Sequence, residues 1–391
     1  MKTVVLIDPC TGGHHEWFLQ LFAEELIALG WRVAVIAPGA GTVAAALPAG
    51  MTVVVHEWRP DVSVGVAGRR RLWREAYAAV VALEGELGAP VDLVFFAWLD
   101  AFLGHGFSRY WIDRCFPREW SGLVFQPWMF RVPMRARWLR HLWLDPLEPL
   151  HSRRCRWLAT LDEAVTGPLA RVVGRPVIPF PDVADDSSAN TSLAGELQRL
   201  AAGRSVVLLT GVVDRRKGLG RFFAAAREAN ATDWLFVVAG PVAWDGLPAA
   251  EAEELRRWIA SPPEQGHILV QRSLSEGEVN ALVRAAAAVW LSYENFPFSS
   301  NLLSKCARFC VPAVGNGRFL IGERMRAFSL GIEIPERGEA AWFASAGARG
   351  ALRQFAAAPE FRAGCARYSN AHSREALRAA LATGLGIPMP N

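Results

Sequence analysis

The hydrophobic pattern alternates between short continuous apolar runs and longer segments whose apolar residues recur at helical spacing. In the first half, the apolar runs predict buried strands at 4–7, 32–37, 52–56, 91–96, 122–125 and 156–161. In the second half, they predict strands at 205–210, 234–239, 267–271, 288–291 and 313–314. Amphipathic segments between the runs, such as 69–87 and 275–286, predict helices, the latter with a capping box of Ser275 and Glu278. Strands alternating with helices favour parallel sheets, which bind ligands at the carboxyl ends of their strands.

The pattern restarts after a proline-rich stretch, which indicates two domains. Arg175–Asp182 holds three prolines within six residues, and the polar segment 185–192 after it is predicted to be a loop. We predict an α/β protein with two doubly wound, Rossmann-like parallel-sheet domains facing a cleft, at 1–178 and 179–370. Residues 371–391 are predicted to be a C-terminal helix or tail, with a return to the first domain as one option.

Composition excludes several classes of function. The chain has 391 residues, 52% of them hydrophobic, and a formal net charge of +4, which is too small to indicate nucleic-acid binding. The chain has no apolar run of about 18 residues, so the sequence predicts no membrane-spanning helix. The first residues do not resemble a signal peptide. The six cysteines form no C-x-x-C pair and no zinc-ligand pattern. These features predict a cytoplasmic protein with reduced cysteines.

One polar stretch, Tyr293–Lys305, lies between a predicted strand and a predicted helix. Its triplet Ser299, Ser300 and Asn301 stands at the helix start, where exposed N–H groups and the helix dipole favour an anion. We interpret this as a site for the phosphates of a sugar nucleotide, although the same residues would cap any helix. Lys305 follows one turn later on the face of Asn301 and is a candidate for phosphate or ribose binding, with a surface lysine as the alternative.

A second candidate loop, 211–218, also joins a predicted strand to a predicted helix. It ends in Arg216, Lys217 and Gly218. Arginine can bind two phosphate oxygens through its planar fork, and lysine acts as a point charge, so both are candidate phosphate ligands. The alternative is a solvated turn.

These loops and their order resemble the GT-B-fold glycosyltransferases, specifically the retaining group of glycosyltransferase family four with a Glu-x7-Glu signature. The segment 211–218 resembles the glycine–basic loop of that group. The segment from Glu294 to Val314 is similar to its signature region, and Gly12-Gly13 resembles its N-terminal glycine-rich loop. The resemblance in organisation covers nearly the whole chain, whereas its specific motifs cover about a tenth.

The sequence departs from the pattern of that group at three positions. Val212 stands where the group usually has an arginine, and Lys305 stands where the second acid of the signature is expected. Gln126 lies in the segment where the group often has a catalytic histidine. The chain therefore resembles a divergent relative of that group.

The resemblance implies a hexosyltransferase that moves a sugar from a nucleotide diphosphate sugar to an acceptor hydroxyl, with retention of configuration. It implies Glu294 as a ligand of the donor sugar, with a loop acid paired to an arginine as the alternative. It also implies that no metal ion or other cofactor is needed, because Arg216, Lys217 and a helix N-terminus would stabilise the leaving diphosphate. Two alternatives remain, a non-catalytic binding or partner subunit and a nucleotide-sugar epimerase of the same fold.

Two further candidates lie in the first domain. Gly12, Gly13, His14 and His15 form a loop that lets the backbone approach a ligand, and the resemblance places it at the cleft near the acceptor. We predict no metal there, because no third ligand is close in the sequence. Asp100 follows the strand 91–96 and could orient or deprotonate an acceptor hydroxyl, with a helix N-cap as the alternative. The catalytic candidates are thus Asp100, Glu294 and Lys217.

The segment 110–157 is rich in arginine and tryptophan and poor in acids. Such a composition is typical of contact with a membrane surface or an anionic acceptor, and 131–143 could form an amphipathic helix. The alternative is that the arginine stems and tryptophans pack on the surface of their own domain. We predict no nucleic-acid partner. For the location of the protein, attachment to the membrane surface from the cytoplasm is one option.

Overall fold

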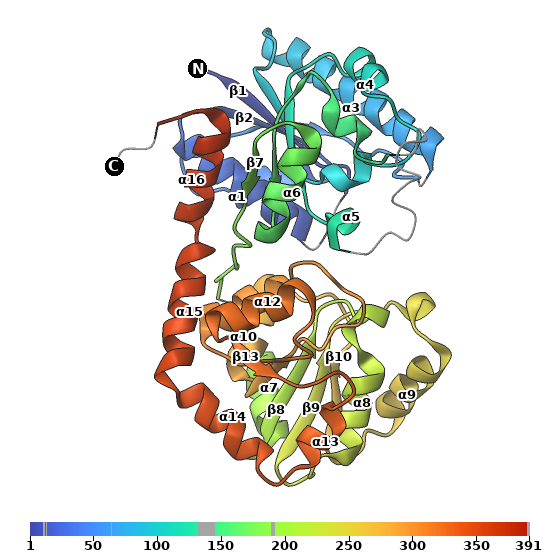
Figure 1. The fold of residues 1–391 in the computed structure, drawn as a ribbon, viewed down its shortest axis with the longest axis vertical. Coiled ribbons are helices and arrows are strands. Elements are labelled where there is room, and N and C mark those ends of the chain that lie inside the picture. The colour runs from blue at the N-terminus through green and yellow to red at the C-terminus, as the bar shows by residue number, and fades with distance from the viewer. Residues whose placement is uncertain (11, 13, 64, 132–144, 189–191, 389–391) are drawn as a thin grey trace. The chain divides into compact units, whose positions relative to one another are not determined.

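The computed structural model describes residues 1–391 apart from 11, 13, 64, 132–144, 189–191 and 389–391. It divides into two compact units (Figure 1). Unit 1 comprises Met1–Pro181 together with Arg374–Asn391, and unit 2 comprises Asp182–Ser373. The amphipathic helix considered for 131–143 lies almost wholly outside the described residues.

Unit 1 is built on a parallel sheet of seven strands in the order β3-β2-β1-β4-β5-β6-β7. The strands are Thr3–Ile7 (β1), Arg32–Ala37 (β2), Val54–Glu57 (β3), Leu93–Phe96 (β4), Trp120–Val124 (β5), Cys155–Thr160 (β6) and Val177–Pro179 (β7). The helices are His14–Ala28 (α1), Ala40–Ala46 (α2), Val66–Leu87 (α3), Arg109–Cys115 (α4), Trp128–Arg131 (α5), Glu163–Val173 (α6) and Arg374–Leu385 (α16), with short 3-10 turns at Leu99–Phe102 (η1) and Glu148–His151 (η3). The carboxyl-terminal helix α16 packs against α1 of this unit.

Unit 2 is built on a parallel sheet of six strands in the order β10-β9-β8-β11-β12-β13. The strands are Ser205–Thr210 (β8), Trp234–Ala239 (β9), Gly266–Val270 (β10), Ala288–Trp290 (β11), Ala313–Gly315 (β12) and Gly331–Glu333 (β13). The helices are Ser192–Ala201 (α7), Leu219–Glu228 (α8), Ala249–Ala260 (α9), Glu276–Ala285 (α10), Asn301–Phe309 (α11), Phe319–Phe328 (α12), Glu339–Ala344 (α13), Ala348–Ala357 (α14) and Pro359–Ala371 (α15), with 3-10 turns at Arg215–Lys217 (η4) and Trp244–Gly246 (η5).

Burial of apolar strands on both faces holds each unit together. Every residue of β1, β4, β8 and β9 is buried, as expected for parallel strands covered by helices on both sides. In unit 1, the buried Trp73 of α3 packs edge-on against aromatic rings of Phe96 and Trp120. None of the described helices is long and apolar enough to cross a membrane.

The two doubly wound parallel sheets confirm the predicted fold class, and the capping box of Ser275 and Glu278 is also confirmed. The proline-rich stretch Arg175–Asp182 does contain the boundary between the units, after Pro181, but its residues Val177–Pro179 also form an edge strand of the first sheet that the sequence analysis missed. An edge strand tolerates proline, because one side of its backbone needs no partner strand. The chain leaves unit 1 after Pro181 and re-enters it at Arg374.

Candidate functional site

Each sheet has one place where the strand order reverses direction. In unit 2 it lies between β8 and β11, and in unit 1 it lies between β1 and β4. Loops at the carboxyl ends of such neighbouring strands diverge and leave room for a ligand. The loop 211–218 after β8 and the loop from Ser292 to Ser300 after β11 meet at the reversal point of unit 2, and they hold most of the predicted donor residues.

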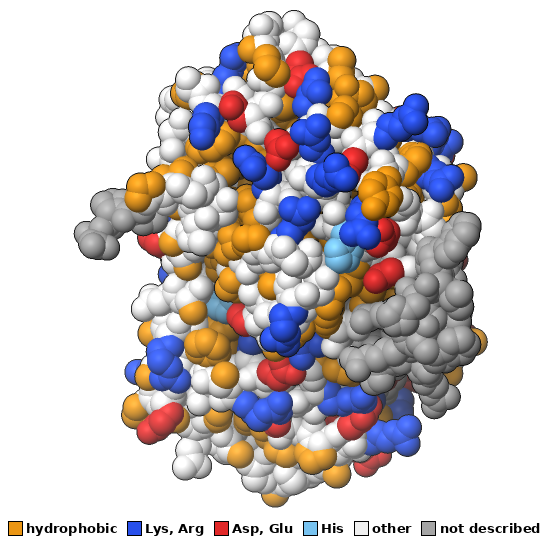
Figure 2. All heavy atoms as spheres, turned by 45° about the horizontal axis from the view of Figure 1, so that its top comes forward, with side chains coloured by type: hydrophobic (Ala, Val, Ile, Leu, Met, Phe, Trp, Pro, Cys, Tyr) orange, Lys and Arg blue, Asp and Glu red, His pale blue; other side chains and the backbone are white. Residues whose placement is uncertain are grey.

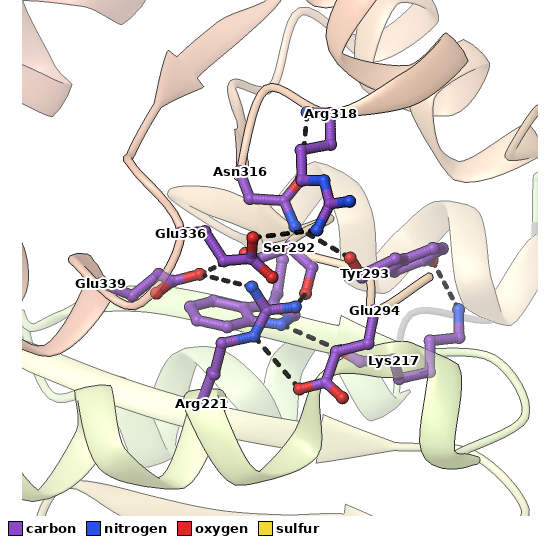
Figure 3. Close-up of polar contacts among 10 residues, drawn as sticks. Lys217, Arg221, Ser292, Tyr293, Glu294, Asn316, Arg318, Glu336 and Glu339 are labelled. Carbon is purple, nitrogen blue, oxygen red and sulfur yellow. Dashed lines mark hydrogen bonds and ion pairs between the residues drawn. The ribbon is translucent and has the colours of Figure 1, made fainter. Parts of the chain in front are cut away.

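Lys217 lies at this point as a buried cation. Its side chain is mostly enclosed, with the residue 6% exposed, and its Nζ donates to the backbone oxygen of Thr210 at 3.0 Å. The Nζ also donates to Tyr293 Oη at 2.6 Å (Figure 3). The ammonium also lies over the Tyr293 ring, 4.6 Å from its centre. Among the described residues, no carboxylate forms an ion pair with Lys217. Within the described part of the chain, its charge is therefore stabilised by neutral oxygens alone, an arrangement that favours a bound anion.

Backbone contacts fix the two loops against each other. The Glu294 N–H donates to the Arg216 oxygen at 2.7 Å, and the Trp290 indole N–H donates to the Lys217 oxygen at 3.1 Å. Gly218 has a φ of 67°, and a Cβ there would collide with the Ser292 oxygen, so only glycine fits at this close approach. These contacts place Arg216 and Lys217 beside the Tyr293–Glu294 loop.

The side chains of Arg216 and Glu294 lie at the accessible rim of this site. Arg216 is paired with Asp214 at 2.7 Å and lies over the Phe296 ring, 5.2 Å from its centre. Glu294 Oε1 lies 3.2 Å from Arg221 Nε, so an arginine does pair with this acid. Both side chains remain partly exposed and are accessible to a ligand.

The partly buried Arg221 and the buried Glu339 form an ion pair next to Glu294 that the sequence analysis missed. Arg221 donates to Glu339 at 3.1 Å and to the Ser292 oxygen at 2.8 Å, and the Ser292 hydroxyl also bonds to Glu339 (Figure 3). Arg221 lies in the first turn of α8, directly after the loop 211–218, and this position beside a predicted phosphate loop was the available signal. Nearby Glu251 has a raised pKa, chiefly because of burial and then because of the negative charge of Glu294.

The residues at the start of α11 already bind a carboxylate of this chain, that of Asp182. Asp182 accepts hydrogen bonds from the Ser299 hydroxyl and from Asn301 Nδ2, the latter at 3.0 Å. Ser300 is the N-cap but makes no side-chain capping bond, and its hydroxyl lies 3.5 Å from Tyr293 Oη. The structure therefore brings Ser300 toward the Lys217 site, whereas the Ser299 and Asn301 side chains are directed at Asp182.

The expectation for Lys305 needs correction. Its side chain is 2% exposed, and its Nζ is enclosed by Asn280 Oδ1 at 2.6 Å, Glu276 Oε2 at 2.8 Å and the Asp185 oxygen at 3.4 Å. Asn280 in turn donates to Asp185 and to the Ser187 oxygen, both at 3.0 Å. Lys305 thus joins α10 and α11 to the segment after Asp182 and is not directed at the Lys217 site. The predicted ribose or phosphate contact fails because the ammonium already has a complete set of partners.

In unit 1, Asp100 lies within η1 and its carboxylate binds backbone N–H groups. Its two oxygens accept from Phe125 at 2.7 Å and from Gln126 at 2.9 Å. Burial raises the pKa of Asp100 to about 6, although these two bonds oppose the shift. The carboxylate lines a cavity of about 410 Å³ with residues that include Arg69, His105 and Trp128. The N-cap alternative for Asp100 is wrong, because it anchors the end of β5 instead.

The glycine–histidine loop after β1 is described in part. Gly12 has a φ of 80°, which suits glycine, whereas Gly13 and the His14 side chain lie outside what the structure describes. His15 Nδ1 lies 2.9 Å from Asp8 Oδ2. The expectation that no third metal ligand is near was wrong, because single ligand atoms of Asp8, Cys10 and His15 all lie within 4.8 Å of one another. Asp8 was missed, although it stands at the carboxyl end of a parallel strand.

Comparison with protein-family models and with curated protein sequences found no match. Among solved structures, the chain is similar to Alr3699/HepE from Anabaena in complex with UDP and glucose, at 13% identity and a TM-score of 0.69, over 99% of this chain and 100% of that one. It is similar to a sucrose-phosphate synthase from Thermosynechococcus elongatus, at 15% identity and 0.64, over 98% of both chains. It is also similar to a glycosyltransferase from Rickettsia africae, at 12% identity and 0.61, over 98% and 97%. The chain has the two-sheet, Rossmann-like architecture of GT-B glycosyltransferases.

Proposed function

We propose that the protein transfers a sugar from a nucleotide diphosphate sugar to an acceptor hydroxyl. The observation that carries this proposal is the buried ammonium of Lys217 at the strand reversal of unit 2, where no described carboxylate balances it. A diphosphate would supply the missing negative charge at the place where an open parallel sheet binds its ligands.

The remaining donor residues fit this chemistry. Negative charge develops on the diphosphate as the bond to the sugar breaks, and a fixed cation at that position lowers the barrier. Lys217 supplies it, with Arg216 at the rim and the Ser300 hydroxyl close by. Glu294 would accept hydrogen bonds from sugar hydroxyls, with Arg221 holding its carboxylate in place.

The solved relatives support a nucleotide-sugar donor. Alr3699/HepE was crystallised with UDP and glucose, with UDP-glucose and with UDP, and all three structures match nearly the whole of this chain. We therefore place uridine diphosphate sugars first among the donors to be tested, and a hexose first among the sugars.

A thermal-shift panel of UDP-, GDP-, dTDP- and ADP-sugars tests the donor. We expect one nucleotide class to raise the melting temperature, because a ligand that binds only the folded state stabilises it. Lys217→Met should abolish that shift, whereas Lys2→Ala, in unit 1, should preserve it. If no nucleotide sugar stabilises the wild-type protein, the proposal fails.

Release of nucleoside diphosphate separates transfer from the two alternatives. A non-catalytic binding subunit would be stabilised by the donor but release nothing, and an epimerase would change the sugar without needing an acceptor. We expect release that accelerates when a competent acceptor hydroxyl is added. Asp100, which lines the cavity of unit 1, is our candidate for contact with that acceptor.

The resemblance implies retention and independence from metal ions, and both can be measured. With retention, the leaving diphosphate accepts the acceptor proton on the face from which it departs. With inversion, a protein base accepts it on the opposite face. The anomer of the product distinguishes them. Metal independence predicts that activity persists in excess EDTA, because Lys217 takes the place of the cation.

We propose that the protein lies in the cytoplasm, peripheral to the membrane, and that 110–157 contacts a membrane surface or an anionic acceptor. Within the described part, Tyr110 is 63% exposed and Trp128 is 40% exposed. In Figure 2, basic side chains lie among hydrophobic ones on the face shown. Flotation with phosphatidylglycerol vesicles, but not with phosphatidylcholine vesicles, would support a membrane contact.

A further inference from the structure

The cavity of unit 1 combines a polar side with an apolar side. Its volume of about 410 Å³ lies within the range of ligand pockets. Leu103, Met129 and Leu147 belong to its apolar lining, and the last two are buried core residues. Arg69 and Asp100 belong to its polar lining. Such a cavity suits a ligand that has a charged or polar group on a less polar body.

The guanidinium of Arg69 has no hydrogen-bond or ion-pair partner among the described residues. Arg69 is partly buried and lies near the start of α3, whose first turn contains no acid. The next two residues are arginines that do have partners. Arg70 donates to a backbone oxygen at 3.3 Å, and Arg71 pairs with Asp61. A partly buried charge without a partner costs free energy, so Arg69 favours an anion in the cavity.

The backbone at Gly104 helps to position the Arg69 side chain. A Cβ at position 104 would lie 2.7 Å from Arg69 Nη1 and 2.9 Å from Arg69 Cζ. The guanidinium therefore packs directly against this glycine. A side chain at position 104 would displace the guanidinium but leave its charge in the protein, which gives a second way to test its role.

Asp100 adds a hydrogen-bond acceptor to the same cavity. Its oxygens accept the N–H groups of Phe125 and Gln126, which partly offset its negative charge. Arg69 and Asp100 are both described, and no ion pair joins them, so Asp100 does not neutralise the guanidinium. Each carboxylate oxygen has two lone pairs, so Asp100 can accept a further bond from a hydroxyl.

We propose that the cavity of unit 1 binds an oxyanion, a phosphate or a carboxylate, through Arg69. The planar guanidinium can donate two parallel N–H bonds to such a group. The body of the ligand lies against the apolar side of the cavity, and a hydroxyl of the ligand donates to Asp100. Resting on the proposed function, this inference assigns the acceptor to hydroxylated molecules that carry a phosphate or a carboxylate.

Ligand-observed NMR and calorimetry on the full chain, without a donor, test the site. Three matched probes share a hydroxylated ring: para-hydroxybenzoate carries a carboxylate, para-hydroxyphenyl phosphate carries a phosphate, and para-hydroxybenzamide is neutral. We expect at least one anion to bind about tenfold more tightly than the amide, because hydrogen bonds to charged groups are the stronger ones. The anion that binds more tightly identifies the source of the oxyanion.

Four variants locate the binding. Arg69→Met should weaken anion binding about tenfold or more and leave amide binding unchanged. Gly104→Ala should also weaken anion binding, because it displaces the guanidinium and keeps the charge. Arg74→Met is the matched control, since Arg74 is an exposed arginine of the same helix, and it should bind the anion as the wild type does. Lys217→Met should keep anion binding too, which separates this site from the donor site.

Further readouts distinguish ligand binding from a role in folding. The melting temperature of Arg69→Met should match that of the wild type, because the guanidinium has no partner in the described part of the chain. Arg69→Lys should recover part of the affinity. In the transfer assay, Arg69→Met should raise the KM for an anionic acceptor and keep the full donor-induced melting shift.

Several outcomes would overturn the inference. These are no binding of either anion, equal binding of the amide and the anions, and wild-type anion binding in Arg69→Met. Equal losses in Arg69→Met and Arg74→Met would indicate unspecific attraction to a basic surface and would overturn it as well. If no nucleotide sugar stabilises the wild type, the proposed function fails, whereas anion binding without a donor still decides the fate of this site. If transfer occurs and no anion binds, only this inference fails.

Discussion

Lys217 and Lys305 are both buried lysines of unit 2, yet their ammonium groups have different partners. Lys217 has a backbone oxygen and a tyrosine hydroxyl, whereas Lys305 has Glu276 and Asn280. Burial of a charge costs free energy unless it is paired. Lys305 meets this condition within the fold, whereas Lys217 has no acidic partner among the described residues.

The two lysines therefore predict opposite effects on replacement by methionine. Lys217→Met should change the free energy of unfolding by less than about 1 kcal/mol, because losing two hydrogen bonds and removing an unpaired charge offset each other. Lys305→Met should destabilise by about 1–3 kcal/mol, because it leaves Asn280 and Glu276 without their partner.

Urea unfolding and donor thermal shift on both variants check this contrast. The donor-induced shift should be lost in Lys217→Met and kept in Lys305→Met. The reverse result would show that Lys305 binds the donor, and it would contradict a purely structural role for the Lys305 ammonium.

At the scale of secondary-structure elements, the end of α15 is tied to the start of unit 2. His372 follows α15, and its Nδ1 accepts the Asp182 N–H at 2.9 Å. Its ring stacks on Tyr368, with centres 4.0 Å apart. Since Asp182 also binds Ser299 and Asn301, one residue connects α15 with the start of α11.

Because this connection includes His372, it predicts that unit 2 loses stability toward unfolding at low pH. Burial, followed by the charge of Arg324, lowers the pKa of His372 to about 3, whereas an unfolded histidine has its ordinary value of about 6.5. Between these values the unfolded chain binds more protons, so stability is lost as the pH falls from about 6.5 toward 3, by up to about 1.4 kcal/mol per pH unit. Urea unfolding of unit 2 across this range measures the slope.

His372→Asn should flatten that slope, because asparagine can accept the Asp182 N–H without titrating. His267→Gln, at a second histidine of unit 2 in β10, serves as the control and should leave the slope unchanged. An unaltered slope in His372→Asn would show that another group carries the acid sensitivity.

The sequence pattern predicts the elements better than it predicts the contacts between them. Apolar runs located β2, β8 and β9 to the residue, because strands that are buried over nearly their whole length stand out as continuous apolar runs. The edge strand β7 was missed, because its prolines also signal a linker. The helix α7 begins at Ser192, in a segment expected to be polar loop.

The sequence predicted which loops form the site, but not which side chains pair with one another within it. Lys217 and Glu294 were found because each follows a strand. The partners of Lys305 lie 25 and 29 positions away in the sequence, and only the packing of α10 against α11 brings them together. Asp8 and His15 are separated by a turn of the chain whose conformation no periodic pattern encodes.

At the scale of the whole molecule, α16 completes unit 1 from the far end of the chain. Arg374 and Arg378 bond to Glu25 of α1 at 3.0 and 2.8 Å, and Arg374 also bonds to Glu24. Buried residues of the helix, Leu377, Leu381 and Ala382, add apolar contact. Both glutamates are buried, so α16 supplies their charge partners.

Truncation after Ser373 is therefore expected to lower the melting temperature of unit 1 and to leave that of unit 2 unchanged. The loss combines exposed apolar surface, at about 1.5–3 kcal/mol for each large side chain, with two buried acids left unpaired. Differential scanning calorimetry should resolve the two transitions. Removal of residues 389–391 alone is the control, and equal melting in both truncated forms would contradict a role for α16.

The discontinuity of unit 1 also has a consequence for the order in which the protein matures on the ribosome. Domains generally fold from the amino terminus as they emerge. Here all of unit 2, Asp182–Ser373, is synthesised before the helix that unit 1 lacks. The unit that begins first is thus the last to be finished, and the surface of α1 that α16 covers stays exposed while unit 2 is being synthesised.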